Sequence, residues 1–220
     1  MINIKKAENI QEYKQVYKLI DKALAEASNE NQNGFLLEKD GFDHFSVHYI
    51  ATSRNQVVGV IRIIFDIDSP KGLPIERHPG IIENINTAHS AEISQFCVKN
   101  NDEYKWLFLL LFRHVYQQCT KRKIEKIYFN LSQDTIYLLE EIGLKVQILG
   151  KKDYSSSFLT LPALWNASDI DSNIRLTNNK FYKWINKNTV VAEETFDLRS
   201  IFPWMYPYSS KNHHLSIAKG

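Results

Sequence analysis

Residues 91–98 (AEISQFCV) place a carboxylate and a hydroxyl in a stretch that alternates polar and apolar side chains. The period of two predicts a half-buried strand on which Glu92, Ser94 and Phe96 share one face. The opposite face then carries Ile93, Gln95 and Cys97. Burying a carboxylate and a hydroxyl without partners is unfavourable, so the strand has one of two settings. Either its polar face meets water at a sheet edge, or Glu92 is a general base and Ser94 orients a substrate in a cleft.

Length and composition indicate a globular protein. The chain has 220 residues, 12% of them aromatic, and a formal net charge of +2, which gives no general attraction to nucleic acid. The longest apolar run, 106–112, is too short to cross a bilayer, and the first residues contain no apolar signal core. We expect a cytoplasmic protein with no nucleic-acid partner and no stable membrane insertion.

The cysteines and histidines indicate neither a disulfide nor a metal site. Cys97 and Cys119 lie apart, in a predicted strand and a predicted helix, and the seven histidines show no spacing typical of metal ligands. The sequence therefore predicts reduced thiols and no bound metal.

The elements around residues 91–98 alternate between strands and helices. Amphipathic or apolar periodicity predicts helices at 10–27, 103–120 and 134–142. Strands are predicted at 2–5, 46–52, 57–65, 91–98, 126–131, 145–149 and 157–161, with a hairpin turn at 53–56. This order predicts an α/β protein with a mixed sheet and helices on both faces. Phe181, Trp184 and Ile185 fit one further helix, and the aromatic segment 202–208 is expected to pack back on the domain.

Four segments resemble a known family in their order and content. They are 38–43 (EKDGFD) with the following 46–48 (SVH), 58–62 (VGVIR), 72–76 (GLPIE) and 91–98. Together they resemble the GNAT N-acyltransferases, in the branch that holds acyl-homoserine-lactone synthases, N-acyl amino acid synthases and exosortase-associated acyltransferases. The resemblance covers about residues 35–160. It implies a GNAT fold over residues 1–162, followed by a C-terminal extension over 163–220.

The resemblance also implies an activity and its site. A GNAT enzyme of this branch moves a long acyl group from a carrier-protein or coenzyme A thioester to the amine of an amino acid or similar metabolite, without a permanently bound cofactor. For this chemistry the candidate catalytic residues are Glu92 and Ser94. Asp40 and Asp43 resemble family positions that shape the acceptor site, and the other candidate substrate-binding residues are Arg62, Gln95, Phe96 and Val98.

Two departures from the family pattern change these expectations. Gln95 stands where the pattern has arginine, which removes a fixed positive charge. The residues before the second helix include Asp102 and Glu103 in place of a glycine-rich pyrophosphate loop, and these carboxylates would repel coenzyme A. We therefore favour acyl carrier protein as the donor. The first helix also lacks the tryptophan and arginine pattern of lactone synthases, so a homoserine lactone product is not expected.

Each candidate residue has a structural alternative. Glu92 is a base, acting directly or through water, or else one half of an ion pair with Arg62. Ser94 binds substrate or bonds to the backbone. The backbone N–H groups of residues 96–98 are candidate oxyanion donors if the strand bulges there. Partly apolar surroundings, which Ile93 and Phe96 are expected to provide, would suit a catalytic carboxylate.

A basic cluster is a candidate landing patch for the acidic helix of a carrier protein. It consists of Lys121, Arg122, Lys123 and Lys126. The alternative is a solvated helix end whose cations complement the helix dipole. Tyr137 is expected in the core rather than at the site.

Two rival functions remain. One is a conventional acetyl-coenzyme A-dependent acetyltransferase, which tight binding of coenzyme A would indicate. The other is a non-catalytic binding module with the same fold. Gln95, in place of the arginine of the family pattern, is the feature that supports this alternative.

Overall fold

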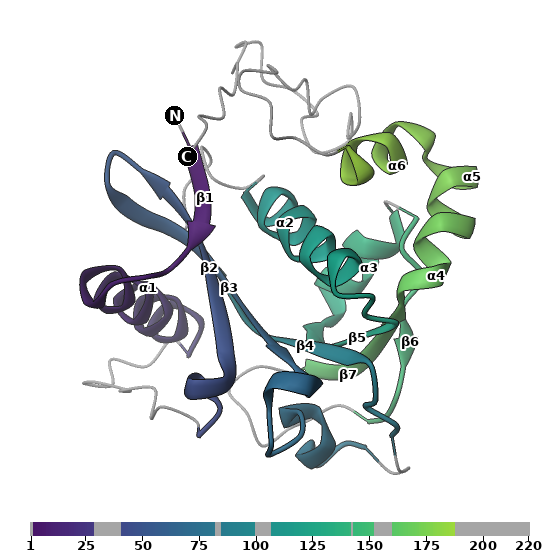
Figure 1. The fold of residues 1–220 in the computed structure, drawn as a ribbon, viewed down its shortest axis with the longest axis horizontal. Helices are drawn as coiled ribbons and strands as arrows, with labels where there is room; N and C mark the ends of the chain where they lie inside the picture. The colour runs from purple at the N-terminus through teal and green to yellow at the C-terminus, as the bar shows by residue number, and fades with distance from the viewer. Residues whose placement is uncertain are drawn as a thin grey trace.

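A computed structural model describes residues 2–28, 41–81, 85–99, 107–141, 143–151 and 160–187 (Figure 1). The strands are β1 (Ile2–Lys6), β2 (Ser46–Ser53), β3 (Gln56–Phe65), β4 (Ser90–Val98), β5 (Lys126–Ser132), β6 (Gln147–Ile148) and β7 (Thr160–Asn166). The main helices are α1 (Ile10–Ser28), α2 (Leu107–Lys121), α3 (Gln133–Glu141) and α6 (Asn179–Asn186). Before α6 come α4 (Ala167–Asp169), the π turn η5 (Ile170–Ile174) and α5 (Arg175–Thr177). Short 3₁₀ turns are η1 (Asp43–Phe45), η2 (Asp66–Asp68) and η3 (Pro74–Arg77).

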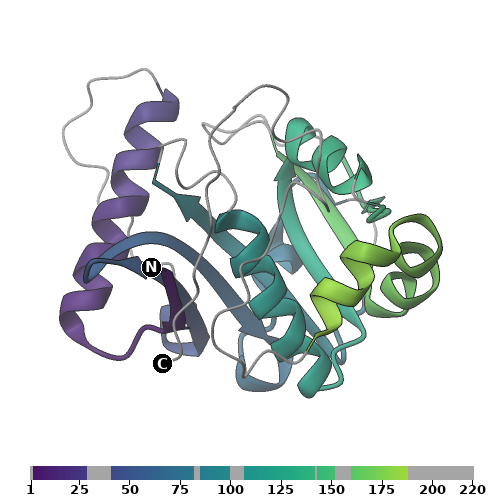
Figure 2. The ribbon, with the colours of Figure 1, turned by 90° about the horizontal axis from the view of Figure 1, so that it is seen from above.

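The seven described strands form one mixed sheet in the order β1-β2-β3-β4-β5-β7-β6. Only β4 and β5 run parallel among the paired strands described here, and α2 is the crossover that joins them. Figures 1 and 2 show α1 on one side of the sheet and α2 on the other. The expected α/β architecture with helices on both faces is confirmed.

Each face of the sheet has its own apolar core. On the α1 face, Val16 and Ile20 pack against Ile50, Val60 and Cys97. On the α2 face, a larger core joins the sheet to α2 and α6, and its members include Ile61, Ile63, Leu111, Phe129 and Trp184. Alternate residues of β3 therefore enter different cores, as the pleat of a strand buried on both sides requires.

The hairpin between β2 and β3 follows from its turn residues. Arg54 and Asn55 have φ values of 50° and 62°, which are the left-handed values that a two-residue primed turn needs. The predicted turn at 53–56 is confirmed, and it sets the register in which His48 lies opposite Arg62.

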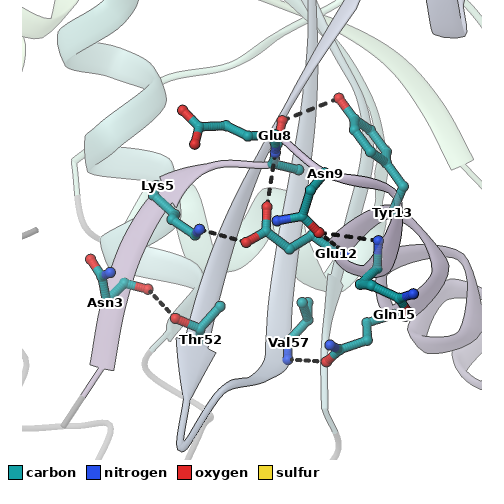
Figure 3. A network of polar contacts seen from close by, with 11 residues as sticks. Asn3, Lys5, Glu8, Asn9, Glu12, Tyr13, Gln15, Thr52 and Val57 are labelled. Atoms are coloured by element: carbon teal, nitrogen blue, oxygen red, sulfur yellow. Dashed lines mark hydrogen bonds and ion pairs between the residues drawn. The ribbon is translucent and has the colours of Figure 1, made fainter.

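Polar contacts fix α1 against the sheet (Figure 3). Asn9 caps the helix, because its Oδ1 accepts the N–H groups of Gln11 and Glu12 at 3.1 and 3.0 Å. Glu12 meets Lys5 of β1 at 2.5 Å, and Gln15 accepts the N–H of Val57 in β3 at 2.9 Å. These bonds tie one end of α1 to two strands and so determine which side of the helix faces the sheet.

The C-terminal part of the described chain is held to α2. Phe181, Trp184 and Ile185 of α6 are buried in the main core, as the prediction of one helix requires. Arg113 of α2 donates to the Lys187 carbonyl at 2.7 Å and lies over the Trp184 ring at 4.9 Å. The segment 202–208 lies outside the described residues.

Three details differ from the sequence-based expectation. The last strand is β7 at Thr160–Asn166 rather than 157–161, so it spans the expected domain boundary at 162, which stays a prediction. The strand expected at 145–149 is only the two-residue β6. Tyr137 was expected in the core but is 58% exposed, because Ile136 and Leu139 form the buried side of α3.

No helix in the described ranges has the length and apolar character to span a membrane.

His114 makes the stability of the fold depend on pH. Its ring lies edge-on to Tyr49 with centroids 4.6 Å apart. Burial, with smaller effects of the Lys121 and Arg113 charges, lowers the pKa of His114 to about 4. The unfolded chain, in which the pKa of this histidine is near 6.5, takes up a proton at a higher pH than the folded protein, in which it is about 4. The free energy of unfolding therefore falls as the pH falls from about 6.5 to about 4.

We therefore expect wild-type protein to lose about 1–2 kcal/mol more stability than His114→Gln between pH 7 and pH 5. Urea unfolding of both proteins at the two pH values measures the difference, and contributions of all other groups cancel. Equal losses in both proteins would contradict a depressed pKa at His114.

Candidate active site

One extra residue interrupts the pairing of β4 with β3. Arg62 lies opposite Gln95 and Ile63 lies opposite Ile93, which leaves Ser94 without a partner on β3. This is a β-bulge, and it changes which face the later residues of β4 occupy. The bulge lies at Ser94 and not within 96–98, where the oxyanion donors were expected.

The bulge corrects the predicted faces of β4. Gln95 and Cys97 lie on the α1 face with Glu92, as shown by Cys97 Sγ, which is 3.6 Å from the Leu19 carbonyl of α1. Phe96 and Val98 turn to the α2 face, where Phe96 meets Phe108 edge-on with centroids 5.8 Å apart. The predicted grouping of Phe96 with Glu92, and of Gln95 away from it, is therefore wrong because strict alternation stops at Ser94.

The neighbouring strands part at the same place. β4 pairs with β5 from Ser90↔Lys126 to Ile93↔Phe129, and the pairing ends there. Beyond it, β4 stays with β3 and β5 stays with β7, and Figure 2 shows the two strands diverging. Within the described ranges, no strand pairs with the β5 side of residues 94–98, so the backbone N–H and C=O groups on this edge take no part in a strand ladder.

Glu92 is buried next to this opening on the α1 face. It is 1% exposed and lies opposite Ile64 of β3 and Tyr128 of β5. Its Oε2 accepts the N–H of Ile75, in η3, at 2.6 Å. The apolar surroundings of this carboxylate are thus Ile64, Ile75 and Tyr128, whereas Ile93 and Phe96, which were expected to provide them, face α2.

The loop that reaches Glu92 is rigidly folded. Glu76 Oε1 accepts the N–H of Leu73 at 3.0 Å and the hydroxyl of Thr87 at 2.7 Å. Gly72 has φ +72°, and a Cβ there would lie 2.5 Å from Glu76 Oε2, so glycine is required. The segment 72–76 that carries part of the family resemblance therefore acts by placing the Ile75 N–H on Glu92.

Arg62 is the buried cation of the site. It is 1% exposed, its Nη1 lies 3.0 Å from Asp43 Oδ1, and its Nε donates to Ser94 Oγ at 2.6 Å. A buried guanidinium needs an anionic partner and further acceptors, which these two side chains supply. The two roles considered for Ser94 were substrate binding and a bond to the backbone; the bond that the structure shows is a third kind, from the Arg62 side chain, and it ties the bulge to Arg62. The substrate role of Ser94 stays a prediction.

Two tyrosines of α1 complete the surroundings of this ion pair. The hydroxyl of Tyr17 donates to Asp43, and burial, with the negative charge of Asp43, raises the pKa of Tyr17 to about 12. The rings of Tyr13 and Tyr17 lie edge-on to His48, with centroids 5.6 and 6.3 Å away. Sequence reasoning placed both tyrosines in an apolar helix face. Their hydroxyl groups, four residues apart, were the signal for a polar site.

Two acceptor oxygens on the same side of the sheet have no donor. Gln95 Oε1 and Asp21 Oδ1 are both buried, and neither has a hydrogen-bond partner in the structure. Leaving such a group unpaired costs about 1–3 kcal/mol. Asp21 was not singled out from the sequence, where it reads as one more polar residue on α1.

The remaining candidate residues lie elsewhere. Asp40 is outside the described residues. In the basic cluster, Arg122 pairs with Asp68 at 2.6 Å and covers the Phe65 ring at 4.0 Å, and Lys126 donates to the Asn86 carbonyl at 3.1 Å. Lys126 is the first residue of β5, and the other three residues of the cluster precede this strand. β4 and β5 are paired at this end, so the cluster lies away from the unpaired edge of β4 at residues 94–98. These contacts favour structural roles for Arg122 and Lys126.

Metal and thiol chemistry find no support in the described part of the chain. It contains no group of three or more histidine, cysteine, aspartate or glutamate side chains placed to hold a metal ion. Cys97 and Cys119 are buried and form no disulfide, and burial raises the pKa of Cys119 to about 12. A thiol of this kind stays protonated and is a poor nucleophile.

The fold matches solved acyltransferase structures. The acyl-homoserine lactone synthase LasI superposes with a TM-score of 0.61 at 15% identity, covering 76% of this chain and 89% of its own. FeeM, an N-acyl amino acid synthase from uncultured soil microbes, gives 0.60 at 12%, covering 80% and 96%. BjaI, a coenzyme A-dependent acyl-homoserine lactone synthase, gives 0.60 at 18%, covering 92% and 97%.

These likenesses define the class of fold. The protein has the GNAT acyltransferase fold in the form found in acyl-homoserine lactone and N-acyl amino acid synthases, as the sequence resemblance implied. At 12–18% identity the comparison carries the fold and not the substrates. No family model matches the sequence, and no curated protein does.

The ion pair makes Asp43 a structural residue as well as a site residue. Asp43→Ala leaves the buried guanidinium of Arg62 without its carboxylate, and we expect a loss of about 3–5 kcal/mol in urea unfolding. Asp68→Ala is the matched control, since its pair with Arg122 has exposed fractions of 46% and 44%, and we expect a change of at most about 1 kcal/mol there. Similar small losses for both variants would show that Arg62 does not depend on Asp43.

Proposed function

We propose that this protein is an N-acyltransferase that moves an acyl group from a carrier-protein or coenzyme A thioester to the amine of a small metabolite. The observation that carries the proposal is the bulge at Ser94. At this one position the strands β4 and β5 part, free backbone donors become available, and Glu92 and Arg62 lie on the adjoining face. A GNAT fold with these features brings a base and oxyanion donors to one edge.

The reaction proceeds by addition and elimination. The amine nitrogen attacks the thioester carbonyl carbon, and the new C–N bond produces a tetrahedral oxyanion. Backbone N–H groups on the free edge of β4 stabilise this oxyanion, at residues 94–96 in place of the expected 96–98. Glu92 takes the proton from the amine nitrogen, directly or through a water molecule. The C–S bond then breaks, the oxyanion collapses to the amide, and the leaving thiolate takes up a proton.

In this proposal the two substrates bind on opposite faces of β4. The amine acceptor lies on the α1 face with Glu92, Arg62 and Gln95. The acyl chain runs along the α2 face, where Phe96 is 44% exposed against Phe108 and where Val98 packs on the core. Phe96 and Val98 thus keep a substrate-binding role, but toward the acyl chain.

The proposed acyl donor is a carrier-protein thioester. The carboxylates of Asp102 and Glu103 favour a carrier protein over free coenzyme A, because they would repel its pyrophosphate. Cys97 and Cys119 form no disulfide, which suits the reducing cytoplasm that we propose as the compartment of the reaction. A carrier that delivers its thioester to the open edge of β4 approaches from the side opposite the basic cluster.

Charge reversal of the basic cluster tests that direction. Lys121→Glu with Lys123→Glu changes two exposed cations that have no role in the proposed chemistry. We expect less than about a twofold change in kcat/KM for carrier-bound donors at low salt, because steering acts on a patch only where the partner docks. A large, salt-dependent loss would place the carrier at the basic cluster.

Glu92→Gln tests the acyl transfer itself. The amide keeps an acceptor oxygen for the Ile75 N–H but cannot take a proton, so we expect a fold of nearly unchanged stability and a fall in kcat of at least about 10²-fold. Amide formation is followed by mass spectrometry, with acyl carrier protein and coenzyme A thioesters of several chain lengths and a pool of amines and amino acids. Glu125→Gln, which changes an exposed acid immediately before β5, is the matched control.

The same assay separates the rival functions. Turnover only with acetyl-coenzyme A would indicate a conventional acetyltransferase. Binding of acyl ligands without any product would indicate a binding module. Wild-type turnover in Glu92→Gln would remove Glu92 from the mechanism.

A further inference from the structure

A row of aromatic rings leads from the unpaired edge of β4 into the main core. Phe96 of β4 meets Phe108 of α2 with ring centroids 5.8 Å apart. Phe112, one helical turn further along α2, lies 6.5 Å from Phe108 and stacks on Trp165 of β7 at 5.2 Å. We call these four residues the aromatic row. It lies on the α2 face of the sheet, where the proposed reaction has the acyl chain.

The exposure of these rings falls steadily along the row. Phe96 is 44% exposed and Phe108 is partly buried, whereas Phe112 and Trp165 are 5% and 2% exposed. Protein interiors are close-packed and contain few voids larger than a water molecule. A ligand can therefore replace the water on Phe96 and Phe108, but it can pass Phe112 only by displacing packed side chains. The aromatic row thus has an accessible half and a closed half.

The pairing of the strands ends near the same place. Ile93 and Phe129 form the last pair between β4 and β5, and both are buried, with exposed fractions of 7% and 3%. The Phe129 ring lies 6.4 Å from Trp165. Beyond this pair, Val98 of β4 and Leu131 of β5 pack against the same core but are only partly buried. The burial of the rings and the end of the strand pairing therefore mark one inner limit.

The accessible half of the aromatic row is short. It extends from Phe96 over Phe108 to Phe112, with the centroid separations of 5.8 and 6.5 Å given above. The three residues of β4 from Phe96 back to Ile93 give a similar length of roughly 10 Å. An extended alkyl chain advances roughly 1.3 Å per carbon, so about eight carbons fill this length.

On the basis of the proposed acyl transfer, we propose that the donor carries a medium-length acyl group, of about six to ten carbons, and that Phe112 and Trp165 set this limit. The carbonyl group lies at the backbone of residues 94–96, and the alkyl chain covers Phe96 and Phe108. Its methyl end meets Phe112, which the Trp165 ring holds in place. A longer chain has to leave its last methylenes in water or displace buried rings, and neither adds to binding.

A series of donors tests this substrate class. Carrier-protein and coenzyme A thioesters from butanoyl to palmitoyl are compared with the acceptor that gives the most amide. We expect kcat/KM to rise by roughly tenfold for every two carbons up to octanoyl, because each added methylene is buried. We expect palmitoyl donors to be at least about tenfold poorer than octanoyl donors of the same type.

Variants at the inner limit test the two residues. Phe112→Leu and Trp165→Phe each shorten a side chain there, and we expect each to raise the rate with palmitoyl relative to octanoyl donors by about tenfold. Trp165→Phe also removes an indole N–H that has no hydrogen-bond partner in the described part of the chain, which offsets some of the lost packing.

Phe65→Leu is the matched control. It makes the same change as Phe112→Leu in the same core, at a residue that is 1% exposed and lies opposite Ala91, where β4 is paired on both sides. We expect it to lower the melting temperature by a similar amount and to leave the preference for octanoyl donors unchanged.

Binding provides a second measurement that does not depend on turnover. In octanoyl- and palmitoyl-pantetheine analogues a methylene replaces the thioester sulfur, so they bind without reacting. By calorimetry, we expect wild-type protein to bind the octanoyl analogue at least about tenfold more tightly, and Phe112→Leu to lose most of this difference.

The outcomes separate this inference from the proposed function. Equal use of palmitoyl and octanoyl donors, an unchanged preference in both Phe112→Leu and Trp165→Phe, or the same shift in Phe65→Leu would overturn the chain limit and leave the acyltransferase standing. Tighter binding of the octanoyl analogue that Phe112→Leu abolishes, without amide from any donor, would overturn the acyl transfer and leave the acyl site standing. Absence of both amide and this binding preference would overturn both proposals.

Discussion

The single extra residue in β4 is the constraint on which the site depends. Up to Ile93, β4 is hydrogen-bonded to β3 on one side and β5 on the other. A strand with an unpaired residue on one side cannot keep the same register with both neighbours, and here the parallel pairing with β5 ends. The edge that is left free lies in the middle of the sheet, between two cores, and not at its rim. In the proposed reaction, the backbone donors of this edge are the ones that stabilise the oxyanion.

The bulge would be a defect if nothing filled the space beside it. Arg62 does so, with Nε on Ser94 and Nη1 on Asp43. The buried charge of Arg62 requires the carboxylate of Asp43, which accepts the Tyr17 hydroxyl. Tyr17 lies on α1, and the first turns of this helix are bonded to β1 and β3. Glu92 is fixed separately, through the Ile75 N–H of a loop that Glu76 caps. The base and the cation are thus positioned by different elements that meet on one face of the sheet.

Much of this architecture could be predicted from the sequence, because the signals were local. Helical periodicity located α1, the primed turn at Arg54 and Asn55 located the hairpin, and the four family-like segments identified the fold and pointed to Glu92, Ser94 and Arg62. The faces of β4 could not be predicted. The polar and apolar alternation of residues 91–98 continues through Ser94 without a break, and only the pairing with β3 reveals the extra residue.

Other features of the site escaped prediction for a similar reason. Tyr13 and Tyr17 lie on a helix whose pattern explains its apolar core, and the role of their hydroxyl groups depends on Asp43, which is distant in the sequence. The basic cluster was predicted as a docking patch from a local run of charge, and that stays a prediction. The fold adds that the cluster lies at the paired ends of β4 and β5, where Arg122 pairs with Asp68.

A structure of the protein with a non-hydrolysable acyl-pantetheine analogue, in which a methylene replaces the thioester sulfur and the carbonyl is kept, would test the central claim most directly. The account predicts that the acyl carbonyl oxygen lies at hydrogen-bond distance, about 2.9 Å, from a backbone N–H of residues 94–96, with Glu92 on the side from which the amine arrives. Binding of the acyl group at another place, such as the pocket lined by Thr120, Lys123 and Asn166 between α2 and β7, would contradict it.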